Sequence, residues 1–217
     1  MTPNREDYLK LIFELGGDTQ RVSNKELTNA LSVSPASVSE MISKLVKDGL
    51  VKHIRYQGVI LTSLGLAKAN TLLRKHRLWE VFLVENLGYK WNDTEVHKEA
   101  ELLEHATSDE LAARLDEFLN SPTYCPHGGI IPKRDEFMQE TYLDTLRKAR
   151  VGTTVMIARI LDEKQFLDYL IKHQIELNES YMIEQIDDEN EKITLTNEKH
   201  TTTISFQAAS MIFIQKI

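Results

Sequence analysis

The residue types in this chain that could do chemistry are most concentrated in one short stretch. In a helix, His97, Glu101, Glu104 and His105 occupy positions i, i+4, i+7 and i+8, so their side chains share one face. Carboxylates and imidazoles together are ligands that suit Mn, Fe, Co and Zn. The spacing therefore indicates a candidate site for a divalent cation. A solvent-exposed acidic helix face has the same pattern, so the stretch alone leaves both interpretations open.

Two further places carry residue types that bind metals. His76 and Glu80 lie one helical turn apart, and Cys125 and His127 lie in a loop that also contains Pro126. By itself the first pair is more often a local hydrogen bond, and a loop cysteine is by default a small apolar side chain. Each pair is therefore a fragment that needs partners from elsewhere in the fold.

Composition places the chain among soluble globular proteins of one to three domains. Of its 217 residues, 41% are hydrophobic and 27% are charged. Charged residues begin at Arg5, so no signal peptide is expected, and no apolar run approaches the roughly 20 residues that span a bilayer. The single cysteine excludes an internal disulfide and a multi-cysteine zinc cluster. A cytoplasmic protein without membrane contact is expected.

The net charge of −7 is distributed unevenly along the chain. Residues 1–75 carry 11 Lys+Arg against 7 Asp+Glu, a net charge of +4. Residues 76–145 carry −9 and residues 146–217 carry −2. A basic N-terminal third on an acidic body suits a polyanion-binding module joined to a part that binds cations.

The first 62 residues have the pattern of a winged helix-turn-helix. An apolar stripe starts after Pro3, a capping box opens a second helix at Ser23, and Ser34-Pro35 opens a third. Two short strands, Leu50–Ile54 and Val59–Thr62, then form a hairpin. The third helix has small outward residues first and lysines last, which suits entry into a DNA groove. The candidate DNA contacts are Ser34, Pro35, Ala36, Ser37, Ser39, Glu40, Lys44, Arg55 and Tyr56.

A helical middle section and a β-rich end follow. One amphipathic helix is expected over Ser63–Leu87, then the acidic helix, then a helix capped by Ser108. Their leucines and phenylalanines exceed what the helices could bury alone, so a homodimer interface is expected. The remaining chain predicts a small β-barrel with one helix near Lys164–Lys172. The predicted strands are Thr154–Leu161, Tyr181–Ile186, Ile193–Thr196, Thr202–Phe206 and Ile212–Ile217.

The fold class predicted is α+β, mainly α. Residues 1–70 form the winged helix-turn-helix, residues 71–144 a helical dimerisation and metal-binding domain, and residues 145–217 the small β-barrel.

The chain resembles the diphtheria-toxin-repressor family of metal-dependent transcriptional repressors, in particular its manganese-responsive branch. The resemblance rests on four segments spread over the first two predicted domains, with a C-terminal part similar to the FeoA-like domain of longer members. The segments are Arg5-Glu6-Asp7-Tyr8-Leu9, Val33-Ser34-Pro35-Ala36-Ser37-Val38, Arg74-Lys75-His76-Arg77-Leu78 with Glu80, and His97 followed by Glu101-x-x-Glu104-His105.

The resemblance implies two metal sites. The primary site would be Asp7, Glu101, Glu104 and His105, and the secondary site would be Glu80, Cys125, His127 and Asp162, with His76 and His97 as weaker candidates. Iron-responsive members have Met and Cys where this chain has Asp7 and Glu101, so Mn²⁺ is the expected cofactor, with Fe²⁺, Co²⁺, Zn²⁺ or Cd²⁺ as substitutes. Lys10 stands where some manganese-dependent relatives carry a further carboxylate, which disfavours a coupled two-metal cluster.

The resemblance implies that a metal-loaded dimer binds operator DNA and represses metal-uptake genes. The chain would be neither an enzyme nor a receptor for a small-molecule substrate. Two alternatives stay open at this point: a winged-helix regulator of a non-metal effector, and a metallohydrolase, although the chain has no His-Glu-x-x-His motif.

Overall fold

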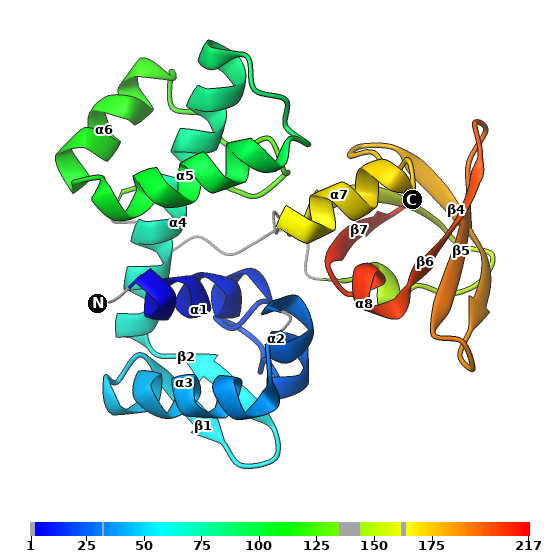
Figure 1. Ribbon diagram of the computed structural model, residues 1–217, viewed down its shortest axis with the longest axis horizontal. Helices are drawn as coiled ribbons and strands as arrows, with labels where there is room; N and C mark the ends of the chain where they lie inside the picture. The colour runs from blue at the N-terminus through cyan, green and yellow to red at the C-terminus, as the bar shows by residue number, and fades with distance from the viewer. Residues whose placement is uncertain (1–2, 32, 135–143, 162–163) are drawn as a thin grey trace.

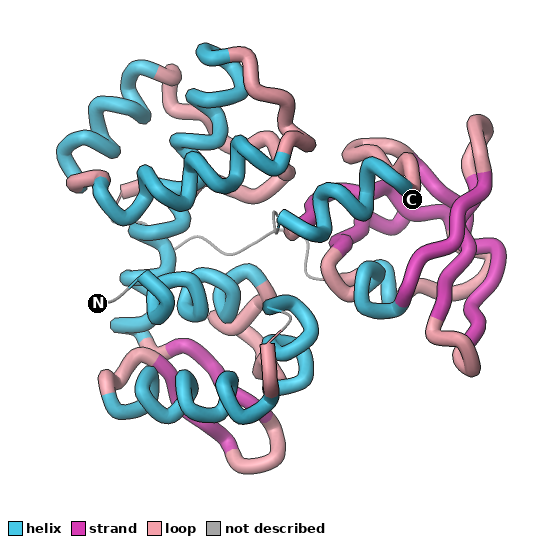
Figure 2. The backbone as a smooth tube through the Cα atoms, viewed as in Figure 1, coloured by secondary structure: helices cyan, strands magenta, loops and turns pink. Residues whose placement is uncertain are grey.

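The computed structural model describes residues 3–31, 33–134, 144–161 and 164–217. Its three parts are seen in Figure 1: a helical unit with a hairpin, a second helical unit above it, and a sheet unit beside both. Figure 2 shows that strands dominate only the last of these. The predicted α+β fold is confirmed. The boundaries at 70/71 and 144/145 stay predictions, and helix α4 (Ser63–Leu87) runs unbroken through the first of them.

The first unit is a winged helix-turn-helix. Its elements are α1 (Pro3–Glu14), α2 (Asn24–Leu31), α3 (Pro35–Lys47), β1 (Val51–Ile54) and β2 (Gly58–Leu61). Helix α3 begins where Ser34 Oγ accepts the backbone N–H of Ser37 at 3.1 Å, with Pro35 in its first turn. Its buried face packs into the same apolar core as α1. The position of α1 therefore determines where α3 is presented.

The second unit consists of α4, α5 (Thr94–Ala106) and α6 (Asp109–Phe118). Thr62 caps α4 at one end, and Gly88, in the left-handed conformation with φ of 77°, ends it. Helix α4 contacts α1, α5 and α6, so it connects the two helical units. The acidic stretch of the sequence is helical as predicted and lies on α5.

The third unit is a five-stranded antiparallel sheet of order β6-β5-β4-β3-β7. Its strands are β3 (Thr154–Ile160), β4 (Ser180–Asp187), β5 (Lys192–Thr196), β6 (Thr201–Ser205) and β7 (Ile212–Lys216). A 3₁₀ turn, η1 (Leu146–Lys148), precedes it, and helices α7 (Lys164–Lys172) and α8 (Phe206–Ala209) accompany it. Helix α7 contacts α5 of the second unit.

The three units meet at the C-terminal end of α1. Arg159 of β3 is 1% exposed, and its Nη2 donates to the backbone oxygen of Glu14 at 3.0 Å. Arg77 of α4 reaches the Glu14 carboxylate at 3.2 Å. Two arginines from different units thus hold the last residue of α1, where the helix dipole favours positive charge.

Replacing Arg159 with Met should loosen the sheet unit from α1. The change leaves the buried Glu14 oxygen without this donor and removes the guanidinium from the Phe213 ring, 3.6 Å away. We expect a loss of about 1–3 kcal/mol in the free energy of unfolding, measured by urea titration. Arg150→Met, at an exposed arginine, is the control. Equal stability of the two variants would contradict this docking role.

Candidate metal centre and DNA-binding surface

Asp7, Glu104 and His105 form one cluster of metal-ligating side chains. One ligand atom from each lies within 4.8 Å of the others. His105 Nε2 is 3.4 Å from Asp7 Oδ1 and 3.4 Å from Glu104 Oε1. Asp7 comes from α1 of the winged unit, whereas the other two come from α5. The cluster therefore joins two parts of the chain that lie almost 100 residues apart in sequence.

The two carboxyl groups of this cluster differ electrostatically. Burial raises the pKa of Asp7 from 3.8 to about 6, opposed by Lys10 and reinforced by Glu101 and Glu104. For Glu104, burial also favours the neutral form, but His76 and Lys10 together outweigh it and lower its pKa to about 2. The surroundings therefore favour the ionised form of Glu104 and disfavour the ionised form of Asp7. A bound cation would favour the ionised form of Asp7.

The donor set fits a divalent cation. Asp7 Oδ1 is buried and makes no hydrogen bond with any described residue. Two carboxylates and an imidazole, all without sulfur, match the ligand preferences of borderline and harder divalent metals. The buried Oδ1 is the atom that such a cation would satisfy.

Glu101 lies apart from this cluster. Its carboxylate is 3.7 Å from His97 Nε2, and its side chain is 41% exposed. His97 instead groups with His76 and Glu80, with one ligand atom of each within 4.8 Å of the others. The structure thus brings together three of the four residues predicted for the primary site and places Glu101 beside them on the same helix.

Glu80, Cys125 and His127 form a second, fully buried cluster. His127 Nδ1 lies 3.0 Å from Glu80 Oε1, and its Nε2 donates to the Trp91 backbone oxygen at 2.7 Å. That hydrogen bond fixes the ring and directs Nδ1 into the cluster. Burial, followed by the charge of Glu80, raises the pKa of the Cys125 thiol. For His127, burial favours the neutral ring, but Glu80 and Cys125 raise its pKa well above 6.5. Asp162, the fourth predicted ligand, lies outside the described residues.

His76 connects the two clusters. Its Nδ1 contacts Glu104 Oε2, and its Nε2 lies 3.2 Å from Glu80 Oε1. Both carboxylates and the ring are completely buried. A continuous series of acids and imidazoles therefore runs from Asp7 on α1 to the loop of His127.

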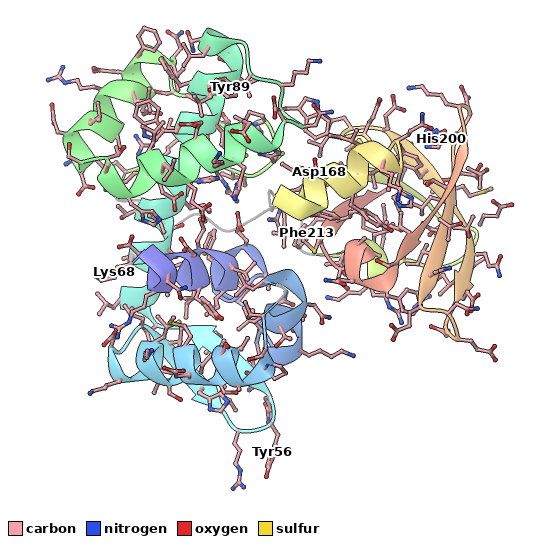
Figure 3. All side chains as sticks on the ribbon, viewed as in Figure 1. Tyr56, Lys68, Tyr89, Asp168, His200 and Phe213 are labelled. Atoms are coloured by element: carbon pink, nitrogen blue, oxygen red, sulfur yellow. The ribbon has the colours of Figure 1, made fainter. Side chains whose placement is uncertain are left out.

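The candidate DNA contacts lie at the start of α3, along α3 and at the tip of the hairpin. Along α3 the predicted residues before Glu40 are exposed, and Glu40 itself pairs with Lys44 at 2.7 Å. At the wing, Arg55 lies over the Tyr56 ring at 4.8 Å, and Tyr56 is 90% exposed. Figure 3 shows Tyr56 at the tip of the hairpin, pointing away from the body of the molecule. The predicted contacts on these two elements are exposed or half-buried, and they are Ser34, Pro35, Ala36, Ser37, Ser39, Glu40, Lys44, Arg55 and Tyr56.

Two residues at the metal cluster were not among the predicted ligands. Glu6 Oε2 lies 2.6 Å from His105 Nδ1, which leaves Nε2 directed at Asp7 and Glu104. Lys10 is 6% exposed and lies 3.0 Å from Glu104 Oε2. An acid in a first helical turn is commonly explained by the helix dipole, which hides the role of Glu6. The signal for Lys10 was its place three residues after Asp7, on the same helix face.

Two segments of the chain match known protein-domain families. Residues 1–59 match "Iron dependent repressor, N-terminal DNA binding domain", and residues 62–133 match "Iron dependent repressor, metal binding and dimerisation domain".

Among the described residues, no helix is both long and apolar enough to cross a membrane.

Individual relatives agree with these matches. The chain is 36% identical over 127 residues to the iron-dependent repressor IdeR of Mycobacterium leprae, covering 58% of this chain and 54% of that one. It therefore spans about half the length of that relative. The structure of the manganese regulator SloR is 38% identical over 100% of both chains, with a TM-score of 0.82. The crystal structure of ScaR with bound Zn²⁺ is 38% identical, covers 99% of this chain and 100% of that one, and has a TM-score of 0.81.

The pKa of Asp7 makes the stability of the metal-free protein depend on pH. The pKa of Asp7 is about 6 in the folded chain and 3.8 for an aspartate in the unfolded chain. The folded chain therefore binds this proton more tightly than the unfolded chain does. The resulting stabilisation is present below pH 3.8 and is lost as pH rises through about 6. Allowing for partial exposure, it amounts to about 1–2 kcal/mol. Urea titrations with chelator should show that Asp7→Asn removes it, whereas Glu95→Gln, at an exposed acid of α5, retains it.

Proposed function

The chain belongs to the iron-dependent repressor family, the family of diphtheria toxin repressor, and we propose that it is a manganese-dependent repressor. The family consists of transcription regulators and not of enzymes. In our proposal a metal-loaded homodimer binds operator DNA in the cytoplasm, without a small-molecule substrate, and controls metal-uptake genes.

The observation that carries the proposal is the position of Asp7. It belongs to the winged unit, yet its buried Oδ1 faces Glu104 and His105 of the second unit. A bound divalent cation supplies the positive charge that these carboxylates share. Asp7 then fixes α1 against α5, and α1 fixes α3 through their common core. DNA affinity would rise because α3 no longer has to be ordered on binding.

The ligand types support Mn²⁺ as the cation. Asp7, Glu104 and His105 offer oxygen and nitrogen, with no sulfur that would favour softer metals. SloR is named as a manganese regulator, and ScaR has been crystallised with Zn²⁺ and with Cd²⁺, whereas IdeR is named for iron. We therefore propose Mn²⁺ as the cofactor, with Fe²⁺, Co²⁺, Zn²⁺ or Cd²⁺ able to replace it.

We propose that Glu80, Cys125 and His127 hold a second ion. The Nδ1 atom of His127 is buried and directed at Glu80, and the thiol lies in the same cluster. Cysteine would have to lose its proton on binding, so this site would accept Zn²⁺ or Cd²⁺ more readily than the first. Asp162, His76 and His97 remain further candidates, and Glu101 a further candidate at the first site.

Three exposed apolar side chains support dimer formation through the second unit. Leu102 is 63% exposed, Phe118 62% and Leu111 46%. They lie on the neighbouring helices α5 and α6, and a partner subunit would cover them. A two-fold dimer through this face would present two α3 helices to successive major grooves, roughly 34 Å apart.

DNA binding should require Mn²⁺ and should be abolished by a chelator. Gel shifts at fixed salt, using operator fragments selected from a random library, measure this. Asp7→Ala should lower Mn²⁺-stimulated affinity at least tenfold while the α5 donors still capture some metal. Glu95→Ala, at an exposed acid of α5 outside the cluster, is the control. Equal binding of the parent chain with Mn²⁺ and with chelator would contradict the proposal.

Glu40 and Lys44 should affect DNA recognition differently. Glu40 can accept a hydrogen bond from cytosine, so Glu40→Ala should cost about 1–3 kcal/mol and relax specificity at one base pair per half-site. Lys44→Ala should weaken all sequences alike and reduce the slope of affinity against salt. Both changes break the ion pair between these residues, so each is the control for the other. If the two effects were exchanged, α3 would enter the groove in another rotation.

A further inference from the structure

A cavity of about 330 Å³ lies in the second helical unit. Its described walls come from the first half of α4, the start of α6 and the segment of Lys133 and Arg134. Pockets for small organic molecules usually have volumes of about 300–1,000 Å³. Asn70 and Arg74 line the cavity, whereas the metal-ligating His76 lies on another face of α4. The cavity is therefore a candidate binding site separate from the metal clusters.

Asn70 is the buried polar side chain in the wall of this cavity. It is 6% exposed, and neither its Oδ1 nor its Nδ2 makes a hydrogen bond with any described residue. Burying an amide without partners costs free energy, so an asparagine at such a place needs a partner from elsewhere. Its side chain offers two donors and one acceptor. A molecule in the cavity that both donates and accepts hydrogen bonds would satisfy it.

Positive charge predominates around the cavity. The basic side chains that line it are Arg74, Lys75, Lys133 and Arg134. Lys75 Nζ lies 2.8 Å from Oδ1 of Asp109, which also lines the cavity. Arg74 lies 3.0 Å from the Asp116 carboxylate. Two carboxylates thus accompany four cations, and the remaining positive charge would attract an anion.

The proposed dimer face leaves this cavity open. Asp109 and Ala113 line the cavity from one side of α6. The exposed Leu111 and Phe118, which support dimer formation, lie roughly half a turn around the helix from them. A partner subunit on Leu111 and Phe118 would therefore not compete with a ligand for this site.

We propose that the cavity binds a small organic anion, one that carries a phosphate or carboxylate together with hydroxyl or amide groups. The anionic group contacts Lys75, Lys133 and Arg134, and a hydroxyl or amide group exchanges hydrogen bonds with Asn70. The small side chain of Ala112 leaves room for the carbon frame. The site does not depend on metal binding or on the proposed repressor function.

The first test measures binding to the full chain by calorimetry. The probes are glucose 6-phosphate and adenosine monophosphate for phosphate, and citrate and gluconate for carboxylate. At least one probe should bind tenfold more tightly than either glucose or inorganic phosphate, each of which offers only one of the two kinds of group. Which probes bind separates the phosphate from the carboxylate source. Binding by none of the four, or by inorganic phosphate as tightly as by all of them, would overturn the proposal.

The same titration checks the basic side chains. The double change Lys133→Gln, Arg134→Gln should weaken binding of the successful probe at least tenfold. The control is Lys25→Gln, Lys47→Gln, which removes the same charge from exposed lysines of α2 and α3. Equal loss in the two double variants would assign the attraction to overall charge and would overturn the site.

The second test uses Asn70→Leu, which keeps the approximate size of the side chain without its amide. This variant should lose at least tenfold in affinity for the probe, yet its urea midpoint without ligand should rise, because an unpaired buried amide is gone. Asn86→Leu, at an exposed asparagine of the same helix, measures the gain from helix propensity alone. A midpoint of Asn70→Leu at or below that of Asn86→Leu would mean that water or the chain already pairs the amide, and would overturn its role. Neither test uses Mn²⁺ or DNA, so failure here leaves the repressor proposal standing.

Discussion

The structure depends on one buried carboxylate, that of Glu104. It is 1% exposed and meets a lysine of α1, a histidine of α4 and the neighbouring histidine of its own helix. An ionised carboxylate in the interior is tolerated only when such partners surround it. Since His76 and Lys10 lower its pKa to about 2, the charge persists at any physiological pH and holds three helices at one point. The position of α1 relative to the second unit follows from this requirement.

Much of this arrangement could be predicted from local sequence. Helix α4 has the predicted bounds because Thr62 caps its first turn and Gly88 ends it, and both residues directly adjoin the helix in sequence. The ligand types and their shared helix face were likewise readable from spacing. The direction of individual side chains was not: Glu101 shares the face of His105, yet its carboxylate lies nearest His97. Sequence spacing predicts which residues share a helix face, whereas tertiary packing decides which residue each side chain contacts.

The partners that spacing cannot supply are the distant ones. Glu6 and His105 are 99 residues apart, and Lys10 and Glu104 are 94 residues apart. Neither segment carries a sequence signal that predicts contact with the other. An acid and a lysine in a first helix are also commonly solvent-exposed. The same holds for Arg159 of the sheet unit, whose acceptor is the backbone of Glu14. Such contacts appear only when the three units are assembled.

These contacts connect both clusters to helix α1. The cluster of Asp7 reaches α1 directly. The loop of Cys125 and His127 reaches it through Arg77, whose guanidinium contacts the Ile130 oxygen and the Glu14 carboxylate. A Cβ at Gly129 would lie 2.5 Å from that guanidinium, so a side chain at this position would displace Arg77. Asp7, Lys10 and Glu14 lie at i, i+3 and i+7, a single face of α1. Both clusters therefore connect to one face of α1, and α1 shares an apolar core with α3.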